Sequence, residues 1–429
     1  MLRLGRRRYL LLLILILLAA VMVRLPIAVY MGDPVTVLPG IHDQVSYDAL
    51  ARSLLAGHGY SFPSNWYPFT PANTPTAHWS FIYPLYLAGV YTLTGYHPLF
   101  ARLVQGILGG VLICLLIYLI GRRLVDETTG LAGAAMAAAY GYFIYYNVSL
   151  MTETFFIVFI LFSLYQSIEL KRKSTLGRWV LLGLGLGMAC LLRQTFLLFV
   201  PFLLLWLLWD LKGLGIRWWY YTIPVIVIIL LIAPWTLRNY RVYHQFLLLN
   251  SNAGYALFAS NNLNLGTDWR NDEVVVPVPA ELTGKNEAEL DRALTRRGFE
   301  LIFADPKRYL LLSLDKTLEY FRFWPVNDSS YISNLNRMLS FGLYLPFMVW
   351  GLGLSVSRWR SFMVLYLFII IHTGIYLLSW PSPRYRLPVD AVLMVFAGMA
   401  LLELVTLLRT WLHRFPSINL RSSKPEDSG

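Results

Sequence analysis

Charged residues are scarce in this chain of 429 residues, because Asp, Glu, Lys and Arg together make up only 14% of it. Average soluble domains carry about 25% charged and about 45–50% apolar residues. This sequence is 57% hydrophobic, and its mean hydropathy is +0.55. Such a composition excludes an intrinsically disordered chain, a coiled coil and a disulfide-rich secreted fold. It predicts that most of the chain lies in a lipid bilayer.

Cysteine is scarce too, and acidic residues are missing from the middle of the apolar runs. Cys114 and Cys190 lie inside such runs, so they are expected to pack as small apolar side chains. Two such residues build neither a disulfide framework nor a metal site. The lack of acidic groups at midplane depth argues against an ion or proton pathway. The chain also has no internal repeat, which weakens the case for a secondary transporter.

Ten apolar runs approach the roughly 20 residues that a helix needs to cross a bilayer. The predicted spans are 9–31, 99–121, 130–148, 151–170, 178–193, 195–209, 218–235, 337–356, 361–380 and 387–408. The first run is long and lacks a cleavage site of small residues, so we expect an uncleaved helix rather than a signal peptide. The shorter stretch 81–95 contains Pro84, Gly89 and Gly95 and is expected to lie at the membrane interface.

Basic residues gather in alternate loops between these spans. Half of the 36 Lys and Arg residues lie at 3–8, 122–123, 171–178, 212–217, 358–360 and 409–424. Lys and Arg in short loops favour the cytoplasmic side of a membrane. This bias predicts a multi-pass protein of the cell inner membrane, with both termini cytoplasmic. It also explains the net charge of +12 without a nucleic-acid partner.

The spans divide the chain into four parts. These are a transmembrane module at 1–235 with a first outer loop at 32–98, an outer-face domain at 236–336, transmembrane helices at 337–408 and a cytoplasmic tail at 409–429. In the outer domain, Glu287–Phe303 is amphipathic, Pro306 interrupts it, and Lys307–Phe323 follows as a second predicted helix. The stretch Asn250–Asn264 is rich in Asn, Ser and Gly and predicts a loop or short strands.

Charged residues within or beside the spans gather on the outer side. They are Asp43, Asp48, Arg52, Arg102, Glu153, Arg193, Arg238, Arg384 and Arg386. Arginine binds phosphate oxygens through two parallel hydrogen bonds, and a carboxylate facing it can act as a general base toward a hydroxyl. The pattern predicts a cavity at the outer leaflet that transfers a group from a lipid-linked phosphate.

Each of these residues also has a structural interpretation. Asp43 precedes an amphipathic helix that ends at Gly57, so it can be an N-cap. Glu153 stands near the start of a span and can favour the helix dipole. His42, His58 and His78 share the first outer loop with Asp43, but their spacing matches no known pattern of metal ligands. The arginines can be interface anchors or can contact lipid headgroups: Arg102, Arg193, Arg384 and Arg386.

Seven motifs that follow one another along the chain resemble GT-C glycosyltransferases that use polyprenyl-phosphate sugars. The branch is that of the protein O-mannosyltransferases and the lipid A aminoarabinose transferase, similar to glycosyltransferase family 39. The first motif is His-Asp-Gln-Val-Ser-Tyr-Asp at 42–48, continued to residue 60. The others are Tyr83–Leu87, Ala101–Gln105, Met151–Phe155, Leu191–Thr195, Pro234–Tyr240 and Pro383–Pro388. Asp305-Pro306 with Lys316 is similar to the family's helical return to the membrane.

This resemblance implies an all-α polytopic GT-C fold and a transfer reaction with inversion, in which Asp43 is the catalytic base. It implies a set of residues that bind substrate or phosphate: Arg238, Arg384, Arg386, Arg102, Arg193, Glu153, Tyr47 and His78. The expected partners are a polyprenyl-phosphate sugar and a lipid, glycan or protein acceptor. No metal ligand set is predicted, and no cofactor is indicated, although the resemblance leaves a divalent metal open.

Two departures from the family pattern leave the sugar undefined. Many relatives have Asp-Glu where this chain has Asp43-Gln44, and many have Pro-Pro where His78-Trp79-Ser80-Phe81 stands. Two other functions stay open from the sequence. One is a lipid or glycan transporter, and the other is a polymerase or ligase that moves whole glycans from a lipid diphosphate.

Overall fold

The computed structural model describes residues 5–39, 41–67, 70–262, 276–327 and 329–414. Over these residues the chain is helical, and its only β-type pairings are isolated bridges such as Ser61 with Pro75. The predicted all-α architecture is therefore confirmed for the described part of the chain. The predicted tail beyond residue 414 lies outside it.

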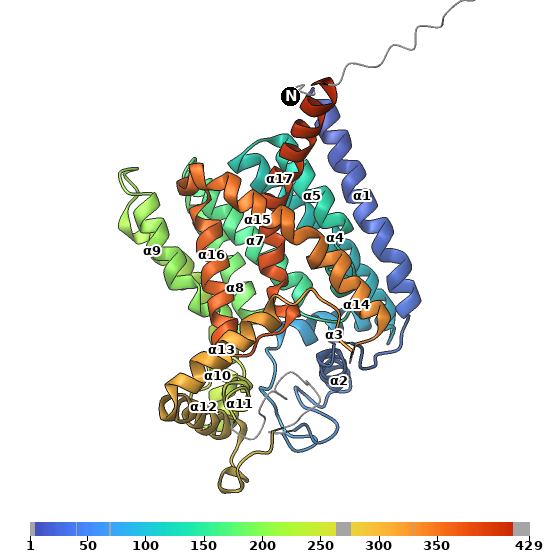
Figure 1. Ribbon diagram of the computed structural model, residues 1–429. Helices are drawn as coiled ribbons and strands as arrows, with labels where there is room; N and C mark the ends of the chain where they lie inside the picture. The colour runs from blue at the N-terminus through green and yellow to red at the C-terminus, as the bar shows by residue number, and fades with distance from the viewer. Residues whose placement is uncertain (1–4, 40, 68–69, 263–275, 328, 415–429) are drawn as a thin grey trace, which may run out of the picture.

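The long helices form one bundle (Figure 1). Its members are α1 (Arg6–Met31), α4 (Pro98–Leu124), α5 (Glu127–Ala139), α6 (Gly141–Val148), α7 (Glu153–Leu170), α8 (Leu176–Leu192), α9 (Val200–Asp210), α10 (Thr222–Tyr243), α15 (Leu343–Ser355), α16 (Trp359–Leu378) and α17 (Leu387–Arg414). The first half of α17 is buried on nearly all sides and packs against α4, α5, α7 and α15. A helix that is apolar all round is expected in this central position.

Ion pairs place several helix ends at one end of the bundle. Arg123 at the end of α4 and Arg178 in α8 both pair with Glu169 of α7, and Lys171 pairs with Asp210 of α9 at 2.7 Å. Figure 1 shows α1 beginning and α17 ending at this same end. The described basic stretches at 6–8, 122–123, 171–178 and 212–217 are thus at one end of the bundle, as the alternation predicted.

Six helical runs are long and apolar enough to cross a membrane among the described residues. They are Arg6–Met31, Pro98–Leu124, Glu153–Leu170, Trp218–Tyr243, Tyr331–Leu378 and Pro383–Leu412, beside two shorter apolar helices at Leu176–Leu192 and Gln194–Asp210. The run Tyr331–Leu378 includes α14 (Tyr331–Arg337), a π-helical turn η6 (Met338–Gly342), α15, η7 (Val356–Arg358) and α16. The exact number of ten spans therefore stays a prediction.

The predicted span at 130–148 is wrong as a single helix, because the chain breaks at Tyr140 between α5 and α6. A helix end leaves carbonyl groups without helical partners. Arg24 of α1, which is fully buried, donates to the carbonyl of Ala138 at 3.3 Å and to that of Ala20 at 2.8 Å. A neighbouring helix therefore supplies part of the hydrogen bonding that the broken helix lacks.

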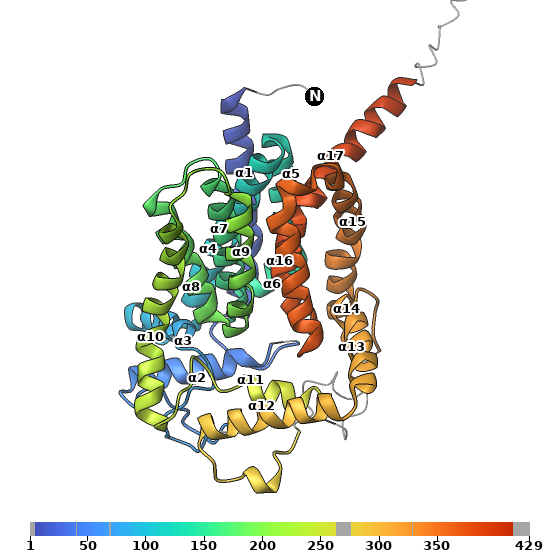
Figure 2. The same ribbon diagram turned by 90° about the vertical axis from the view of Figure 1, so that its left-hand side faces the viewer.

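At the opposite end of the bundle, the segment that the sequence predicts as the first outer loop (32–98) forms two short helices. They are α2 (Asp43–Leu55) and α3 (Ile82–Thr94), which pack on each other and lie below the bundle in Figures 1 and 2. The 13 residues of α3 are too few to cross a bilayer. This short length agrees with the prediction that 81–95 does not span the membrane. Gly57, with φ of +77°, follows α2 in the left-handed region that favours glycine.

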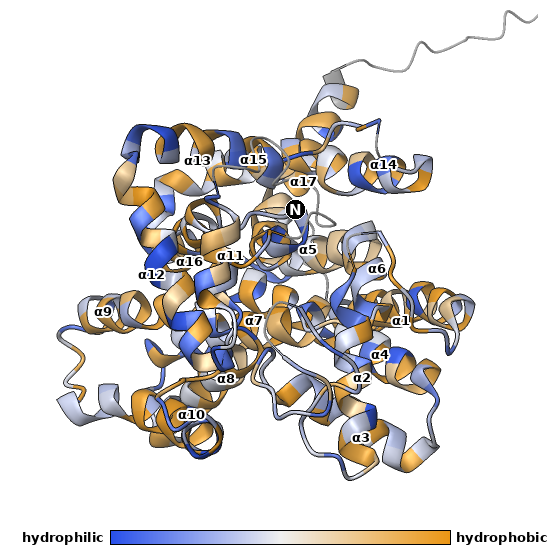
Figure 3. Cartoon of the chain, turned by 90° about the horizontal axis from the view of Figure 1, so that it is seen from below, coloured by the Kyte–Doolittle hydropathy of each residue, from blue (hydrophilic) through white to orange (hydrophobic). Residues whose placement is uncertain are grey.

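Three helices of the segment 236–336, which the sequence predicts as the outer domain, lie at this end as well (Figure 2). They are α11 (Ala253–Ala259), α12 (Glu287–Ala304) and α13 (Pro306–Tyr320), preceded by the turn η5 (Ala280–Leu282). The two amphipathic helices are confirmed, and Asp305 caps α13 by accepting from the backbone N–H of Arg308. Figure 3 shows hydrophilic and hydrophobic residues alternating on both. The expected loop or strands at Asn250–Asn264 are wrong for 253–259, where α11 packs on α12.

Close approach of α5 and α17 depends on glycine. A methyl group placed on Gly398 would lie 2.6 Å from the backbone nitrogen of Gly133 and 2.8 Å from the carbonyl oxygen of Thr129. Backbone atoms cannot move away as a flexible side chain can, so the two helices need glycine at this contact.

We predict that Gly398→Ala destabilises the protein by about 1–3 kcal/mol, the usual cost of overpacking. The matched control is Gly353→Ala in α15, where an added methyl group meets nothing within 4 Å. Thermal unfolding of both purified variants in detergent is the measurement. Equal midpoints for the two variants would show that the α5–α17 contact tolerates a side chain.

Candidate active site

Asp43 lies at the first position of α2, and its carboxylate faces an arginine from the other end of the chain. The carboxylate Oδ2 is 2.9 Å from Nη1 of Arg384, which belongs to the turn η8 (Pro383–Arg386) before α17. The two side chains are 16% and 12% exposed, so solvent or a ligand can reach both. The N-cap of α2 is His42 rather than Asp43, and no side chain caps this end. The N-cap interpretation of Asp43 is therefore wrong.

A second arginine joins Arg384 through an aromatic ring. Nη2 of Arg384 donates to the hydroxyl of Tyr385 at 2.8 Å. The guanidinium of Arg193 lies 4.7 Å from the centre of the same ring, and that of Arg384 lies 4.8 Å from it. A cation near the face of an aromatic ring is attracted by the ring's quadrupole. Tyr385 thus keeps two cations close together that would otherwise repel each other.

Glu153 neutralises the second arginine. Its Oε1 lies 2.6 Å from Nη2 of Arg193, and the glutamate is only 1% exposed. Glu153 begins α7, and Arg193 stands where α8 ends in extended backbone before the turn η1 (Gln194–Leu198). The split predicted at residues 193–195 is therefore confirmed. The contacts run without interruption from Glu153 through Arg193, Tyr385 and Arg384 to Asp43.

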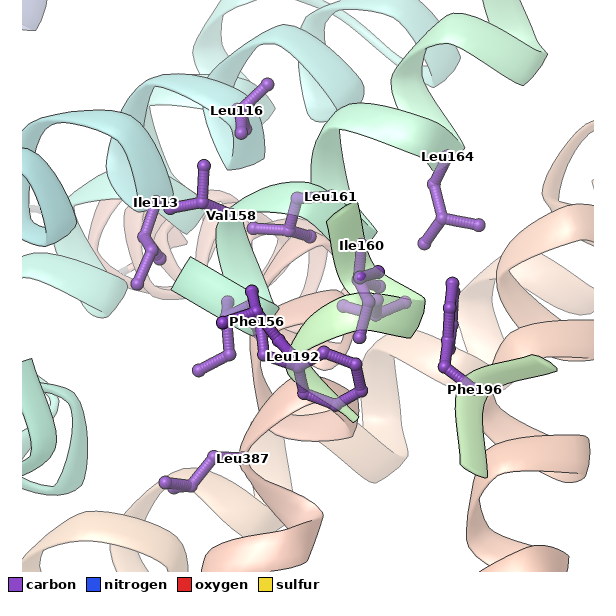
Figure 4. Close-up of a cluster of buried hydrophobic side chains, with 14 of the residues drawn as sticks. Ile113, Leu116, Phe156, Val158, Ile160, Leu161, Leu164, Leu192, Phe196 and Leu387 are labelled. Carbon is purple, nitrogen blue, oxygen red and sulfur yellow. The ribbon is translucent and has the colours of Figure 1, made fainter. Parts of the chain in front are cut away.

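Buried apolar side chains support this row of polar residues. Phe156, Leu192 and Leu387 lie within three positions of Glu153, Arg193 or Arg384 in the sequence, and all three are buried. Figure 4 shows them in one cluster with Leu161 of α7 and Phe196 of η1. Side chains in a close-packed core have little room to move, so the backbone next to them in the sequence, which carries the polar residues, is held in place.

Aromatic side chains stand beside Asp43. The indole N–H of Trp79 donates to Ser46 Oγ at 2.7 Å, and Ser46 donates to the backbone carbonyl of Asp43 at the same distance. The ring of Tyr47 lies 5.2 Å from Trp79 and 5.0 Å from Tyr83. These contacts fix the first turn of α2, and with it the position of the carboxylate.

His78 packs among rings next to this wall. Its ring centre lies 4.6 Å from that of Trp79 and 6.0 Å from that of Trp66. Burial lowers the pKa of His78 to about 4, so the imidazole is neutral at physiological pH. A neutral, 7% exposed ring can offer shape and a hydrogen bond to a ligand, but no positive charge.

Arg238 reaches the first outer loop from the end of α10. Its Nη1 donates to the carbonyl of Thr76 at 2.8 Å and to Asn239 at 3.1 Å, while its guanidinium lies 4.7 Å from the ring of Trp235. The side chain is half-buried. It holds the segment before His78 and places a positive charge at the edge of the site.

The structure separates Arg102 from the other candidates. Its guanidinium is buried and donates to the carbonyls of Gly32, Pro34 and Val148 at 2.9–3.1 Å. It also donates to Gln44 at 3.4 Å. These contacts give Arg102 a structural role at the start of the first outer loop. The expected phosphate contact of Arg102 has no support in them.

Arg386 points into the protein rather than toward Asp43. It has no exposed surface, and its Nε donates to Asp390 Oδ1 at 3.0 Å. Its Nη1 donates to the carbonyl of Tyr320, and its guanidinium lies against the ring of Phe341. Of the two arginines in this motif, only Arg384 lies beside Asp43. The expected substrate contact of Arg386 has no support in this arrangement.

Sequence reasoning missed two residues that matter here. Tyr385 stands inside a quoted motif between two arginines, and that position could have indicated a cation-binding ring. Glu287, the first residue of α12, is 3% exposed and accepts hydrogen bonds from Thr70, Ala77, Tyr243 and Ser251. In the sequence, Glu287 looks the same as an exposed glutamate at the start of an amphipathic helix. No neighbouring residue therefore indicates that it is buried.

Metal-ligating side chains do not gather in the described part of the chain. No group of three His, Cys, Asp or Glu residues is close enough there to hold an ion.

Comparisons with known proteins agree with this architecture. Residues 78–237 match the family described as dolichyl-phosphate-mannose-protein mannosyltransferase. The search of curated proteins returned no match. The solved oligosaccharyltransferase AglB from Archaeoglobus fulgidus, in complex with an inhibitory peptide and a dolichol-phosphate, superimposes with a TM-score of 0.59 at 16% identity. That alignment covers 96% of this chain and 52% of AglB, so this chain spans about half the length of that protein.

A second solved structure is ArnT from Cupriavidus metallidurans bound to undecaprenyl phosphate. It aligns with a TM-score of 0.50 and 15% identity over 96% of this chain and 62% of ArnT. At these identities the likeness concerns the fold. The chain is therefore a GT-C-fold membrane protein, and its residues 78–237 carry the sequence pattern of the mannosyltransferase family within that fold.

Proposed function

We propose that this protein is a membrane glycosyltransferase that moves a single sugar from a polyprenyl-phosphate donor to an acceptor hydroxyl. The observation that carries the proposal is the contact between Asp43 and Arg384 at 2.9 Å. It brings a carboxylate that can take a proton next to a cation that can hold a phosphate. Both groups remain partly exposed, as a substrate site requires.

In the proposed reaction, Asp43 accepts the proton of the acceptor hydroxyl. The hydroxyl oxygen then forms a bond to the anomeric carbon of the sugar. The bond between that carbon and the phosphate oxygen breaks, and the polyprenyl phosphate leaves with the electron pair. Attack from the face opposite the leaving group inverts the configuration at the anomeric carbon.

Arg384 and Arg193 would stabilise the negative charge that grows on the leaving phosphate. Preorganised donors aimed at a developing charge usually make the largest single contribution to catalysis. Glu153 holds Arg193 at 2.6 Å, and Tyr385 holds both arginines. Arg238 offers a third cation at the edge of the site, while Tyr47 and His78 offer surfaces that a sugar can stack against.

An apolar groove near the site suits the lipid part of such a donor. It has a volume of about 470 Å³ and is lined by Leu197, Ile229, Ile232, Ala233, Phe246 and Leu248, among others. Leu197 lies in η1 with Gln194, and Leu248 lies two residues before Asn250. Gln194 and Asn250 exchange backbone and side-chain hydrogen bonds at 3.2–3.3 Å. One side of the groove thus belongs to the turn that follows Arg193, and the other side belongs to the segment that is hydrogen-bonded to this turn.

We place this site on the outer face of the membrane. The basic loops and both described ends of the chain lie at the other end of the bundle, which favours the cytoplasm. The sugar and the acceptor are not identified by the residues present. Because the fold is shared with an oligosaccharyltransferase, transfer of a whole glycan is the second candidate, and the size of the product separates the two.

We predict that Asp43→Asn lowers sugar transfer by at least about a hundredfold, the usual contribution of a general base. The amide keeps the shape of the side chain but cannot take the proton. The readout is mass spectrometry of lipids from a strain that lacks the gene. Polyprenyl-phosphate sugar should accumulate in that strain, and the wild-type gene, but not the Asp43→Asn gene, should remove it.

The control for this experiment is Asp48→Asn, one turn further along α2. Asp48 is 2% exposed and binds Arg52, Tyr91 and Tyr96, so its loss should lower the thermal midpoint but leave transfer within a few-fold of wild type. Normal removal of the lipid-linked sugar by the Asp43→Asn protein would refute the mechanism. Uptake of the substrate into liposomes without a new sugar bond would favour a transporter.

We predict that Ala233→Trp, which fills the groove, raises KM for the lipid-linked donor about tenfold and leaves kcat nearly unchanged. This corresponds to a loss of about 1.4 kcal/mol of donor binding. Leu230→Trp is the matched control, because Leu230 is exposed on the same helix outside the groove. The measurement is steady-state kinetics with donor purified from the deletion strain. An equal KM for both variants would show that the groove is not part of the donor site.

A further inference from the structure

A second pocket lies at the end of the bundle opposite Asp43, between two loops. Its volume is about 470 Å³, and its polar lining comes from Lys171, Arg172, Ser174, Arg217 and Tyr220. One wall is the loop between α7 and α8, and the other is the loop between α9 and the turn η2 (Trp218–Tyr221). Among the described residues, no acidic side chain lines the pocket. The mechanism proposed above uses none of these residues.

Some basic side chains of this region are paired with carboxylates, and others are not. Arg123 and Arg178 share Glu169, and Lys171 is paired with Asp210 at 2.7 Å. Arg172 and Arg217 are exposed, and neither has a carboxylate partner among the described residues. The pocket therefore presents two arginines, one from each wall, whose positive charge no carboxylate of the described residues neutralises.

A hydrogen bond, an ion pair and two glycine turns hold the two loops in place. The indole N–H of fully buried Trp179 donates to Ser174 Oγ at 2.9 Å, which fixes the first loop. The Lys171–Asp210 pair joins the two walls. Gly213 and Gly215 have φ of +90° and +65°, so the second loop uses the left-handed region that glycine adopts without strain.

The pocket also has an apolar part and a position at the bilayer boundary. Leu170, Leu214 and Ile216 complete its lining. Trp218 and Trp219, just beyond the second wall, are 78% and 37% exposed. Tryptophan is enriched where membrane helices meet the headgroup layer. Apolar residues beside two arginines that have no described carboxylate partner fit a molecule with a charged head and an acyl tail.

We propose that this pocket binds the headgroup of an anionic phospholipid, with Arg172 and Arg217 on its phosphodiester. Basic pockets between transmembrane helices on the cytoplasmic side take up anionic lipid headgroups by charge attraction. Guanidinium groups can each donate two parallel hydrogen bonds to phosphate oxygens. Leu170, Leu214 and Ile216 would contact the glycerol and the first acyl carbons. The proposal does not depend on the proposed sugar transfer.

The test uses the full-length protein, purified in detergent and stripped of lipid. Native mass spectrometry then counts bound phosphatidylglycerol and phosphatidylcholine, each added at the same concentration. We expect phosphatidylglycerol to remain bound to the wild type and phosphatidylcholine to be lost. The double variant R172Q/R217Q should retain at least about fivefold less phosphatidylglycerol.

The matched control is R358Q/R360Q, which removes Arg358 at the end of η7 and Arg360 at the start of α16, both outside the pocket. It should retain as much phosphatidylglycerol as the wild type. Equal losses in the two double variants would overturn the proposal, because they would show attraction to basic charge in general. Displacement of the lipid by glycerol phosphate at an equal concentration would also overturn it, since the site would then be one for a free anion. Unchanged thermal midpoints of both variants without lipid show that folding is intact.

Discussion

The buried ion pair of Arg386 and Asp390 determines where the turn η8 lies, and the candidate site depends on that turn. Neither side chain has exposed surface, and Asp390 also accepts a hydrogen bond from Tyr140 at 2.7 Å. Arg386 donates in addition to the carbonyl of Tyr320. A buried charge must be paired and hydrogen-bonded, because the alternative costs several kcal/mol. The network therefore joins η8, α17, the break between α5 and α6 and the end of α13, and it leaves Arg384 facing Asp43.

A second buried carboxylate organises the outer segments. Glu287 brings together the first outer loop through Thr70 and Ala77, the end of α10 through Tyr243, and the following segment through Ser251. Four donors satisfy its oxygens, which is the condition for burying such a group. The carbonyl of Thr76, next to Ala77, in turn accepts a hydrogen bond from Arg238. The position of His78 and Trp79 beside the site thus depends on a helix more than 200 residues away in the sequence.

Much of the fold follows from local sequence pattern. The apolar runs predicted α1, α4, α7 and α17 closely, and the amphipathic pattern around Pro306 predicted α12 and α13. The errors occurred where tertiary contacts override local preference. At Tyr140, where an apolar run breaks, the hydroxyl donates to Asp390. In the polar stretch that forms α11, the helix packs on α12. Neither partner is near in sequence, so no window of residues could have indicated them.

The sequence by itself determined that the chain crosses a membrane, that its basic loops lie on one side, and that its unusual charges lie on the other. These properties depend on composition and spacing, which local residues express. Only the tertiary structure decided which charges meet. It placed Asp43 on Arg384 and Glu153 on Arg193, and it turned Arg102 and Arg386 into the protein. An arginine is chemically the same in each place. Whether it binds a ligand or a carbonyl depends on the neighbours that distant segments bring to it.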